Sequence, residues 1–145
     1  MPVNDGIDPP NIEGTYLVSP YKLIKSNFND SFNSSTTFAD FKLTFSKQNN
    51  ANHTVVCSYV NGAETASGLG SVISGTGNNF TVYTAITGTL DGYQFKTVEI
   101  YSGEITATGI KNFYHTIIMV EPTPETILID QARLFYDQDG FSPKQ

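Results

Sequence analysis

The sequence predicts an all-β protein, and the expected architecture is an antiparallel up-and-down β-barrel of about 8–10 strands. First, 53 of the 145 residues are Ser, Thr, Asn or Gly, which favour strands and turns over helices. Second, apolar and polar residues alternate along most of the chain, as in strands with one buried face. Third, short runs rich in Asn and Gly separate these segments. A β-sandwich stays open as the alternative, because both architectures bury one face of each strand.

The N-terminal half contains three expected strand regions. Residues 12–24 are interrupted at Pro20, which cannot donate a ladder hydrogen bond, so two short strands around a bend are expected. In residues 41–45, Phe and Leu alternate with Lys and Thr, which is typical of a strand with one buried face. The third region, 53–60, ends at Asn61-Gly62, a strong hairpin signal.

The C-terminal half continues as strands joined by turns. Asp91-Gly92 marks a hairpin turn. Residues 61–67 and 131–136 are the best helical candidates, but two turns are too short to be stable without packing. The run 113–120 is apolar on both faces and is expected to be covered on both sides. The expected strands cover residues 69–74, 80–86, 93–101, 104–108, 113–120 and 126–136.

The segment 93–101 changes its apolar face partway along. Tyr93 and Phe95 lie on one face of the expected strand, whereas Val98 and Ile100 lie on the other. A β-bulge inserts one residue and so reverses the alternation. We therefore expect a bulge near Thr97.

We expect one domain, residues 11–141, between two short terminal segments, because the length suits a single domain. Residues 1–10 are acidic, contain Pro and Gly, and show no apolar periodicity, so they are predicted to be a flexible tether. Residues 142–145 are predicted to be a polar tail.

Charge and composition exclude several function classes. The net charge of −6 and the pI of about 4.6 argue against nucleic acid as a partner, because phosphate binding needs a basic face. The chain has no stretch of eighteen apolar residues, so no transmembrane segment is expected. Two His and one Cys do not supply the four ligands of a structural zinc site, and we expect no metal and no cofactor.

No set of residues points to catalysis. The chain lacks a Gly-x-Ser-x-Gly turn, and His53 and His115 lie inside expected strands without a paired nucleophile. Both histidines are therefore interpreted as structural. Cys57 is expected to be buried as a small apolar residue, and Glu99 is expected to face solvent. We predict that the protein is not an enzyme and has no catalytic residues.

The aromatic residues are the informative part of the composition. Ten Phe and eight Tyr occur without any Trp, and many of them fall on the expected strands. In a small barrel, inward side chains either fill the interior or line a cavity for one small ligand, and simple core packing stays the alternative for each. The candidate ligand-binding residues of the barrel interior are Tyr16, Phe41, Phe45, Tyr59, Phe80, Val82, Phe95 and Phe113.

The start of the domain resembles a known signature. The stretch Asn11-Ile12-Glu13-Gly14-Thr15-Tyr16 is similar to the Gly-x-Trp signature on the first strand of lipocalins and related calycin barrels, with Tyr16 in the Trp position. In that family, an Arg of the last strand packs across the aromatic ring. The only Arg here, Arg133, lies in the last expected strand. The resemblance implies that Gly14, Tyr16 and Arg133 form a structural base of the barrel.

The chain also looks like the lipocalin-like proteins of Bacteroides-type bacteria. The stretches 72–81 and 135–141 carry this resemblance. Those proteins begin with a secretion leader, often a lipoprotein one, followed by a short tether. The resemblance therefore implies a secreted, periplasmic or outer-membrane-anchored protein, and it leaves open a lipid anchor in the native precursor.

These observations together predict a function. We expect a non-catalytic binding protein of the cell envelope that holds a small hydrophobic ligand in a β-barrel cavity. The alternative is a β-sandwich module that binds glycans or a protein partner through exposed Tyr rings. The sequence leaves open the identity of the ligand and the oligomeric state.

Overall fold

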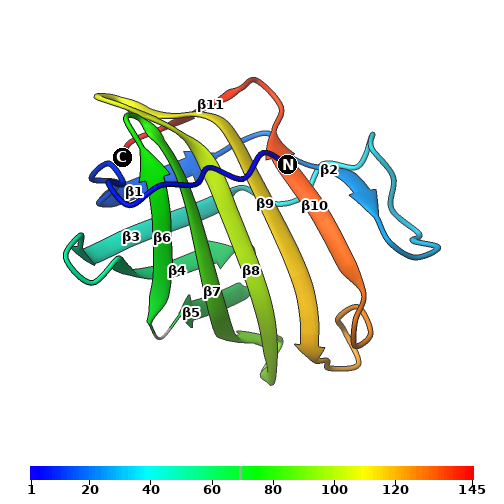
Figure 1. Cartoon of the computed structure of the whole chain (residues 1–145). Helices are drawn as coiled ribbons and strands as arrows, with labels where there is room; N and C mark the ends of the chain where they lie inside the picture. The colour runs from blue at the N-terminus through cyan, green and yellow to red at the C-terminus, as the bar shows by residue number, and fades with distance from the viewer. Residues whose placement is uncertain (69) are drawn as a thin grey trace.

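The chain folds into a closed antiparallel β-barrel (Figure 1). The computed structural model describes residues 1–68 and 70–145, so Leu69 of the expected strand 69–74 lies outside the described residues. The strands are β1 (Gly14–Val18), β2 (Tyr21–Ser26), β3 (Phe41–Asn49), β4 (Thr54–Asn61), β5 (Glu64–Gly68), β6 (Ser71–Thr76), β7 (Asn79–Leu90), β8 (Tyr93–Thr106), β9 (Gly109–Glu121), β10 (Ala132–Asp137) and β11 (Phe141–Pro143).

The pairing of the strands closes the barrel. Within the described residues, the strand order is β1-β3-β4-β5-β7-β8-β9-β10-β2, with every pair antiparallel. β5 and β6 both pair with β4 and β7, and β10 and β11 both pair with β9. β1 and β2 are separated only by Ser19 and Pro20, and they pair with the two ends of the order, β3 and β10. The eleven strands therefore correspond to eight longer segments of chain, and the first segment closes the ring.

Alternation along the strands places one face inside, as the sequence predicts. In β3, Phe41, Leu43 and Phe45 are buried while the residues between them are partly or fully exposed. The turn between β7 and β8 is tight because Asp91 and Gly92 both have positive φ (49° and 86°), which matches the twist of the flanking strands. Period-two patterning and turn residues therefore account for most of the strands, and the barrel, not the sandwich, is the architecture.

The expected reversal of the apolar face in β8 does not occur. The buried residues continue in register from Phe95 through Thr97 and Glu99 to Tyr101, whereas Val98 lies on the outer face and is 40% exposed. A register shift is present between Lys96 and Thr97, as the sequence suggested, but the extra residue belongs to β9, because Lys96 pairs with Glu121 and Thr97 with Met119. The apolar residues in the sequence change face because the inward-facing residues at the centre of β8, Thr97 and Glu99, are polar.

Two segments differ from the expected secondary structure. β5 (residues 64–68) overlaps the helical candidate 61–67, and it is a strand because its backbone groups pair with β4 and β7. The last long strand begins at Ala132 rather than Thr126, and residues 122–131 form a loop at the end of β9. Tertiary pairing thus overrides the weak local signals in both places.

Both terminal segments lie against the barrel. Residues 1–8 run across the outside of β6 to β9 (Figure 1), where Asn4 hydrogen-bonds to Thr81 and to the carbonyl of Phe80. At the other terminus, β11 pairs with β9, and the Gln145 N–H donates to the carbonyl of Thr15. The segments predicted as a tether and a tail therefore make backbone contacts with the barrel wall.

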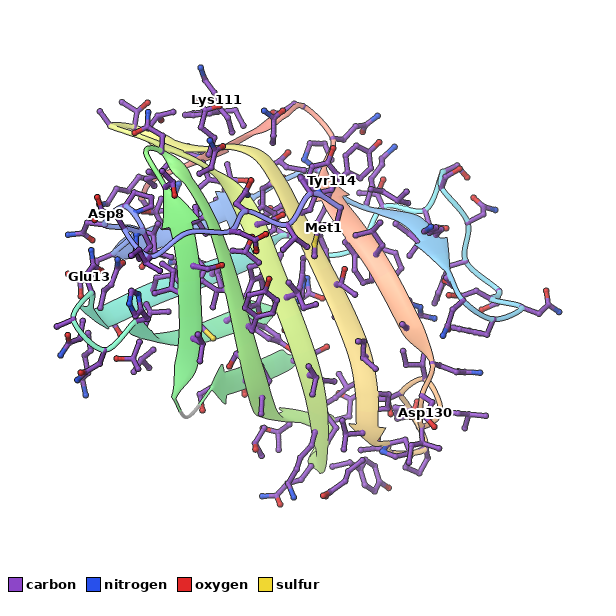
Figure 2. The ribbon with its side chains drawn as sticks, viewed as in Figure 1. Met1, Asp8, Glu13, Lys111, Tyr114 and Asp130 are labelled. Atoms are coloured by element: carbon purple, nitrogen blue, oxygen red, sulfur yellow. The ribbon has the colours of Figure 1, made fainter. Side chains whose placement is uncertain are left out.

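Lys111 and Asp130 lie at opposite ends of the barrel (Figure 2). The described part of the chain has no helix long and apolar enough to cross a membrane.

Candidate functional site

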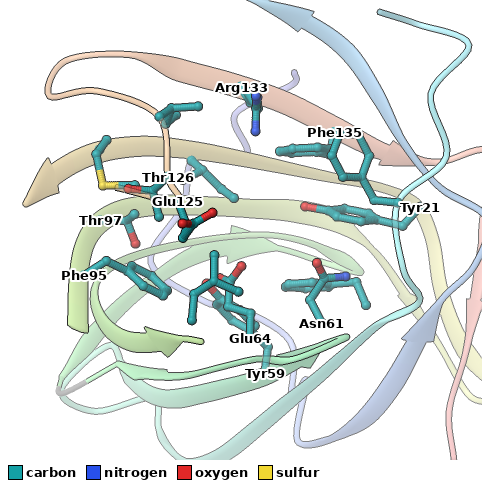
Figure 3. A pocket seen from close by; sticks show the side chains of 16 residues that line it. Tyr21, Tyr59, Asn61, Glu64, Phe95, Thr97, Glu125, Thr126, Arg133 and Phe135 are labelled. Atoms are coloured by element: carbon teal, nitrogen blue, oxygen red, sulfur yellow. The ribbon is translucent and has the colours of Figure 1, made fainter. Parts of the chain in front are cut away.

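The candidate site is a cavity of about 150 Å³ inside the end of the barrel near the β9–β10 loop (Figure 3). Its walls come from strands on both sides of the barrel and from the loop that follows β9. The lining residues are Tyr21, Phe38, Phe41, Tyr59, Asn61, Glu64, Leu90, Phe95, Thr97, Ile117, Met119, Glu125, Thr126, Ile127, Arg133 and Phe135.

Stacked aromatic rings form one wall of the cavity. The ring of Tyr21 lies between Phe41, at a centroid distance of 5.0 Å, and Phe135, at 4.6 Å, with interplanar angles of 21° in both pairs. On the opposite wall, Gly88 of β7 leaves room for Phe95, since a Cβ at this position would lie 2.3 Å from the ring. The rings are buried, so the wall is both apolar and well packed.

Glu64, at the start of β5, is one of two carboxylates that line the cavity, with Glu125 of the β9–β10 loop. The Oε1 of Glu64 accepts the shorter branch, at 2.5 Å, of a shared hydrogen bond from the single O–H of Tyr59, whose longer branch reaches Glu99. Burial raises the pKa of Glu64 from 4.5 to about 7, and the negative charge of Glu99 adds to this, whereas the bond from Tyr59 acts in the opposite direction. The Glu64 carboxyl group therefore titrates near neutral pH.

A network of polar side chains lies behind the cavity, centred on Glu99 of β8. Glu99 is fully buried, and its Oε1 accepts bonds from Thr97 at 2.6 Å and from Tyr59 at 3.2 Å. Its Oε2 pairs with Nε2 of His115 at 2.8 Å and also accepts a bond from Tyr101. The carboxylate thus has four partners from three strands.

The charge state of Glu99 follows from these partners. Burial by itself raises the pKa of Glu99. The positive charge of His115 and its hydrogen bond lower this pKa, and the hydrogen bonds from Thr97 and Tyr101 lower it further, so that it lies below its ordinary value. Glu99 is therefore ionised at neutral pH. Burial, together with this charge, raises the pKa of Tyr101 well above its usual value.

His115 links the network to the cavity. Its Nδ1 is hydrogen-bonded to the Tyr21 hydroxyl at 2.8 Å, and Tyr21 lines the cavity. Nε2–H donates to Glu99 in either charge state, and Nδ1 accepts from Tyr21 when the ring is neutral and donates to the Tyr21 oxygen when the ring is charged. Burial raises the pKa of Tyr21 well above its usual value, so this phenol stays protonated.

Arg133 lies at the mouth of the cavity and not at the barrel base. Its Nε and one terminal nitrogen donate to the two carboxylate oxygens of Asp30, at 2.7 and 2.9 Å, and its guanidinium lies over the rings of Phe28 and Phe32. The ring of Tyr16 is instead approached by Lys144, with Nζ 6.0 Å from the ring centroid. The expectation that Arg133 packs across Tyr16 is therefore corrected, because the loop after β2 brings Asp30 to Arg133.

The Asp30 carboxylate is held ionised by this pairing. Burial alone would raise the pKa of Asp30, but the hydrogen bonds from Arg133, Ser26 and the backbone N–H of Phe32 lower it from 3.8 to about 2. The positive charge of Arg133 is thus balanced at the cavity mouth.

The eight interior candidates are all buried, but they separate into two groups. Phe41, Tyr59 and Phe95 line the cavity. The others pack in the core outside the cavity wall, where Tyr16 contacts Phe45 and donates a hydrogen bond to the carbonyl of Ile12 at 2.8 Å. The core residues outside the cavity lining are Tyr16, Phe45, Phe80, Val82 and Phe113.

Sequence reasoning missed the polar part of the site. Glu99 was expected to face solvent, but it is buried, because it shares the inner face with Phe95 and Tyr101. The sequence did hold a clue. If the strand continues without a bulge after Phe95, every second residue shares its face, and Thr97 and Glu99 then point inside. Cys57 is buried, as expected, and His115 is buried as well.

The described residues contain no group of three or more His, Cys, Asp or Glu side chains placed to hold a metal ion. Comparison of the chain with protein-family models, with curated proteins and with solved structures found no match in any of the three.

Proposed function

We propose that the protein is a non-catalytic binding protein that holds a small hydrophobic ligand in the cavity near the β9–β10 loop of its barrel. The observation that best supports this function is the cavity itself. It combines buried aromatic walls with a few polar groups, as small-molecule sites do. A dry apolar cavity of about 150 Å³ is large enough for a single benzene-sized molecule. The ligand, or the part of it that is enclosed, is therefore about one ring in size.

The proposal assigns the polar network to support rather than to catalysis. Glu99 and His115 pair with each other and with the surrounding hydroxyls, and neither lines the cavity. The network fixes Tyr21, Tyr59 and Thr97, the three lining residues that it contacts directly. Locked side chains of this kind reduce the ordering that a ligand must impose on binding.

We also propose that the protein is related to lipocalin-like proteins. A ring of eight antiparallel segments with a ligand cavity is the arrangement that lipocalins use. A Bacteroides-type origin and export to the cell envelope, with or without a lipid anchor, are supported by the resemblance of the sequence alone. Fractionation of cells that express the full native gene, with labelling by a palmitate analogue, tests the envelope location.

A binding measurement with a cavity-filling variant tests the function. Toluene is titrated into the protein and followed by NMR, and the protein as purified, before any toluene is added, is examined for retained apolar molecules by mass spectrometry. Ile117 lines the cavity, so Ile117→Trp is expected to abolish toluene binding. Its neighbour Ile118 is on the other face of β9, so Ile118→Trp is the matched control and is expected to bind as the wild type does. Equal binding by both variants would contradict the cavity as the site.

A further inference from the structure

The hydrogen-bonding groups along the cavity wall are strongly biased toward acceptors. We propose that the natural ligand is a small amine, with an ammonium group directed at Glu64 and an apolar body among the aromatic rings. This inference rests on the proposed function and names the chemical class of its ligand.

Most hydroxyl and amide donors on the wall are engaged inside the protein. The Tyr59 hydroxyl donates to Glu64 at 2.5 Å, and the Thr97 hydroxyl donates to Glu99 at 2.6 Å. The side-chain amide of Asn61 donates to the carbonyl of Ala39 at 2.6 Å. Each of these groups therefore presents oxygen lone pairs to a ligand.

The Thr126 hydroxyl, from the loop above the cavity, donates to the carbonyl of Thr123 at 3.2 Å. Arg133, the cationic side chain in the lining, donates two of its five N–H groups to Asp30, whose carboxylate balances its charge. A ligand that offers only acceptors would leave the wall oxygens without partners, and unpaired buried polar groups are unfavourable.

Glu64 is the group that a cation would meet. Among the ion pairs of the described residues, none includes Glu64, and its Oε2 has no hydrogen bond to a described residue. Glu125 lines the same cavity from the β9–β10 loop (Figure 3). The buried negative charge of Glu99 lies behind the cavity wall. The local field therefore attracts a positive charge and repels an anion.

The aromatic walls suit the same ligand. Phe41 and Tyr59 pack at a centroid distance of 4.8 Å, and both line the cavity together with Phe95. The faces of aromatic rings attract cations, and the attraction strengthens where water is excluded. The rings therefore provide apolar contact to the body of an amine and a favourable field for its charge.

Three probes that share one ring and one attached carbon test the inference. Benzylamine is cationic, benzyl alcohol is neutral, and benzoate is anionic. Each is titrated into the full chain at pH 8, above the pKa of Glu64, and the dissociation constants are measured by NMR. We expect benzylamine to bind at least about tenfold more tightly than benzyl alcohol, and benzoate to bind more weakly than either.

Glu64→Gln keeps the shape of the side chain and removes its charge. We expect this variant to lose about tenfold in benzylamine affinity and to bind benzyl alcohol as the wild type does. Glu121→Gln removes an exposed carboxylate that pairs with Lys96 outside the cavity, so it is the matched control and is expected to change neither affinity.

The outcomes separate this inference from the proposed function. Binding of benzyl alcohol as tight as that of benzylamine would overturn the amine class and leave the binding function standing. Binding of none of the three probes, together with no effect of Ile117→Trp on toluene, would overturn both. The wild-type comparison decides the matter even if Glu64→Gln does not fold.

Discussion

At the scale of single residues, Glu99 carries a buried charge at the centre of the barrel. Its four partners, Tyr59, Thr97, Tyr101 and His115, offset the loss of its hydration. A buried charge is stable only when it is paired and hydrogen-bonded. The stability of the barrel therefore depends on this carboxylate more than on any exposed charge.

Replacement of Glu99 tests this dependence. Glu99→Ala leaves His115 and two hydroxyls without their acceptor, so we expect a loss of about 3–5 kcal/mol in the free energy of unfolding. Urea denaturation at pH 7 measures the change. Glu104→Ala, on the same strand but partly exposed, is the control and is expected to change the free energy by less than about 1 kcal/mol. Equal effects of the two variants would contradict the buried network.

The Arg133–Asp30 pair gives a second prediction at this scale. The Asp30 side chain is 4% exposed and that of Arg133 is 18% exposed, so removal of either partner leaves a largely buried charge. We expect Arg133→Ala and Asp30→Ala each to lower the free energy of unfolding by about 2–4 kcal/mol. A double-mutant cycle measured by chemical denaturation is expected to show that the two losses are less than additive. Additive losses would mean that the two side chains are not coupled.

At the scale of elements, the N-terminal segment acts as an added edge on the outside of the barrel. The Gly75 N–H of β6 donates to the carbonyl of Gly6, and the Asp8 N–H donates back to the carbonyl of Gly75. The Ser74 hydroxyl donates to the carbonyl of Asn4 at 2.8 Å. The segment therefore satisfies polar groups of β6 and β7 that solvent would otherwise reach.

Deletion of residues 2–8 tests the role of this segment. We expect the deletion to lower the free energy of unfolding by about 1–3 kcal/mol, since each net hydrogen bond contributes about 1 kcal/mol. Hydrogen exchange is expected to accelerate at the Gly75 amide and to stay unchanged in β3, which the segment does not contact through a hydrogen bond. Unchanged exchange at Gly75 would indicate that the segment is a free tether in solution.

The elements also show how far sequence patterning reaches. Residues 41–45 and 80–86 alternate cleanly, and both were expected as strands and are observed within β3 and β7. The pattern misled in β8, where Thr97 and Glu99 face inward and Val98 faces outward. Hydrophobicity assigns a face only when the interior is apolar, and a polar interior reverses the inference.

At the scale of the whole molecule, Glu64 makes stability depend on pH. Its pKa is raised to about 7 from 4.5 by burial, so the folded protein holds this proton more tightly than the unfolded chain does. The resulting stabilisation is fully present below pH 4.5 and is lost as the pH rises through 7. Glu99 has the opposite sign, because its pKa lies below the ordinary value.

The difference between wild type and Glu64→Gln isolates this effect from other titrating groups. We expect the variant to gain stability relative to the wild type by about 2–3 kcal/mol between pH 4.5 and pH 8, after allowing for partial screening by solvent. Urea denaturation at several pH values measures both proteins. Parallel stability curves would contradict the raised pKa of Glu64.

Much of the architecture was determined by the sequence itself. Alternation, turn residues such as Asp91-Gly92, and the aromatic content predicted an all-β barrel with a buried aromatic interior, because these are local properties of the chain. Only the tertiary structure decided which aromatic residues line a cavity and which polar residues join them. Glu99 and His115 are 16 positions apart, and Arg133 and Asp30 are 103 apart. Such partners meet only when the ring of strands closes, and no local pattern encodes that register.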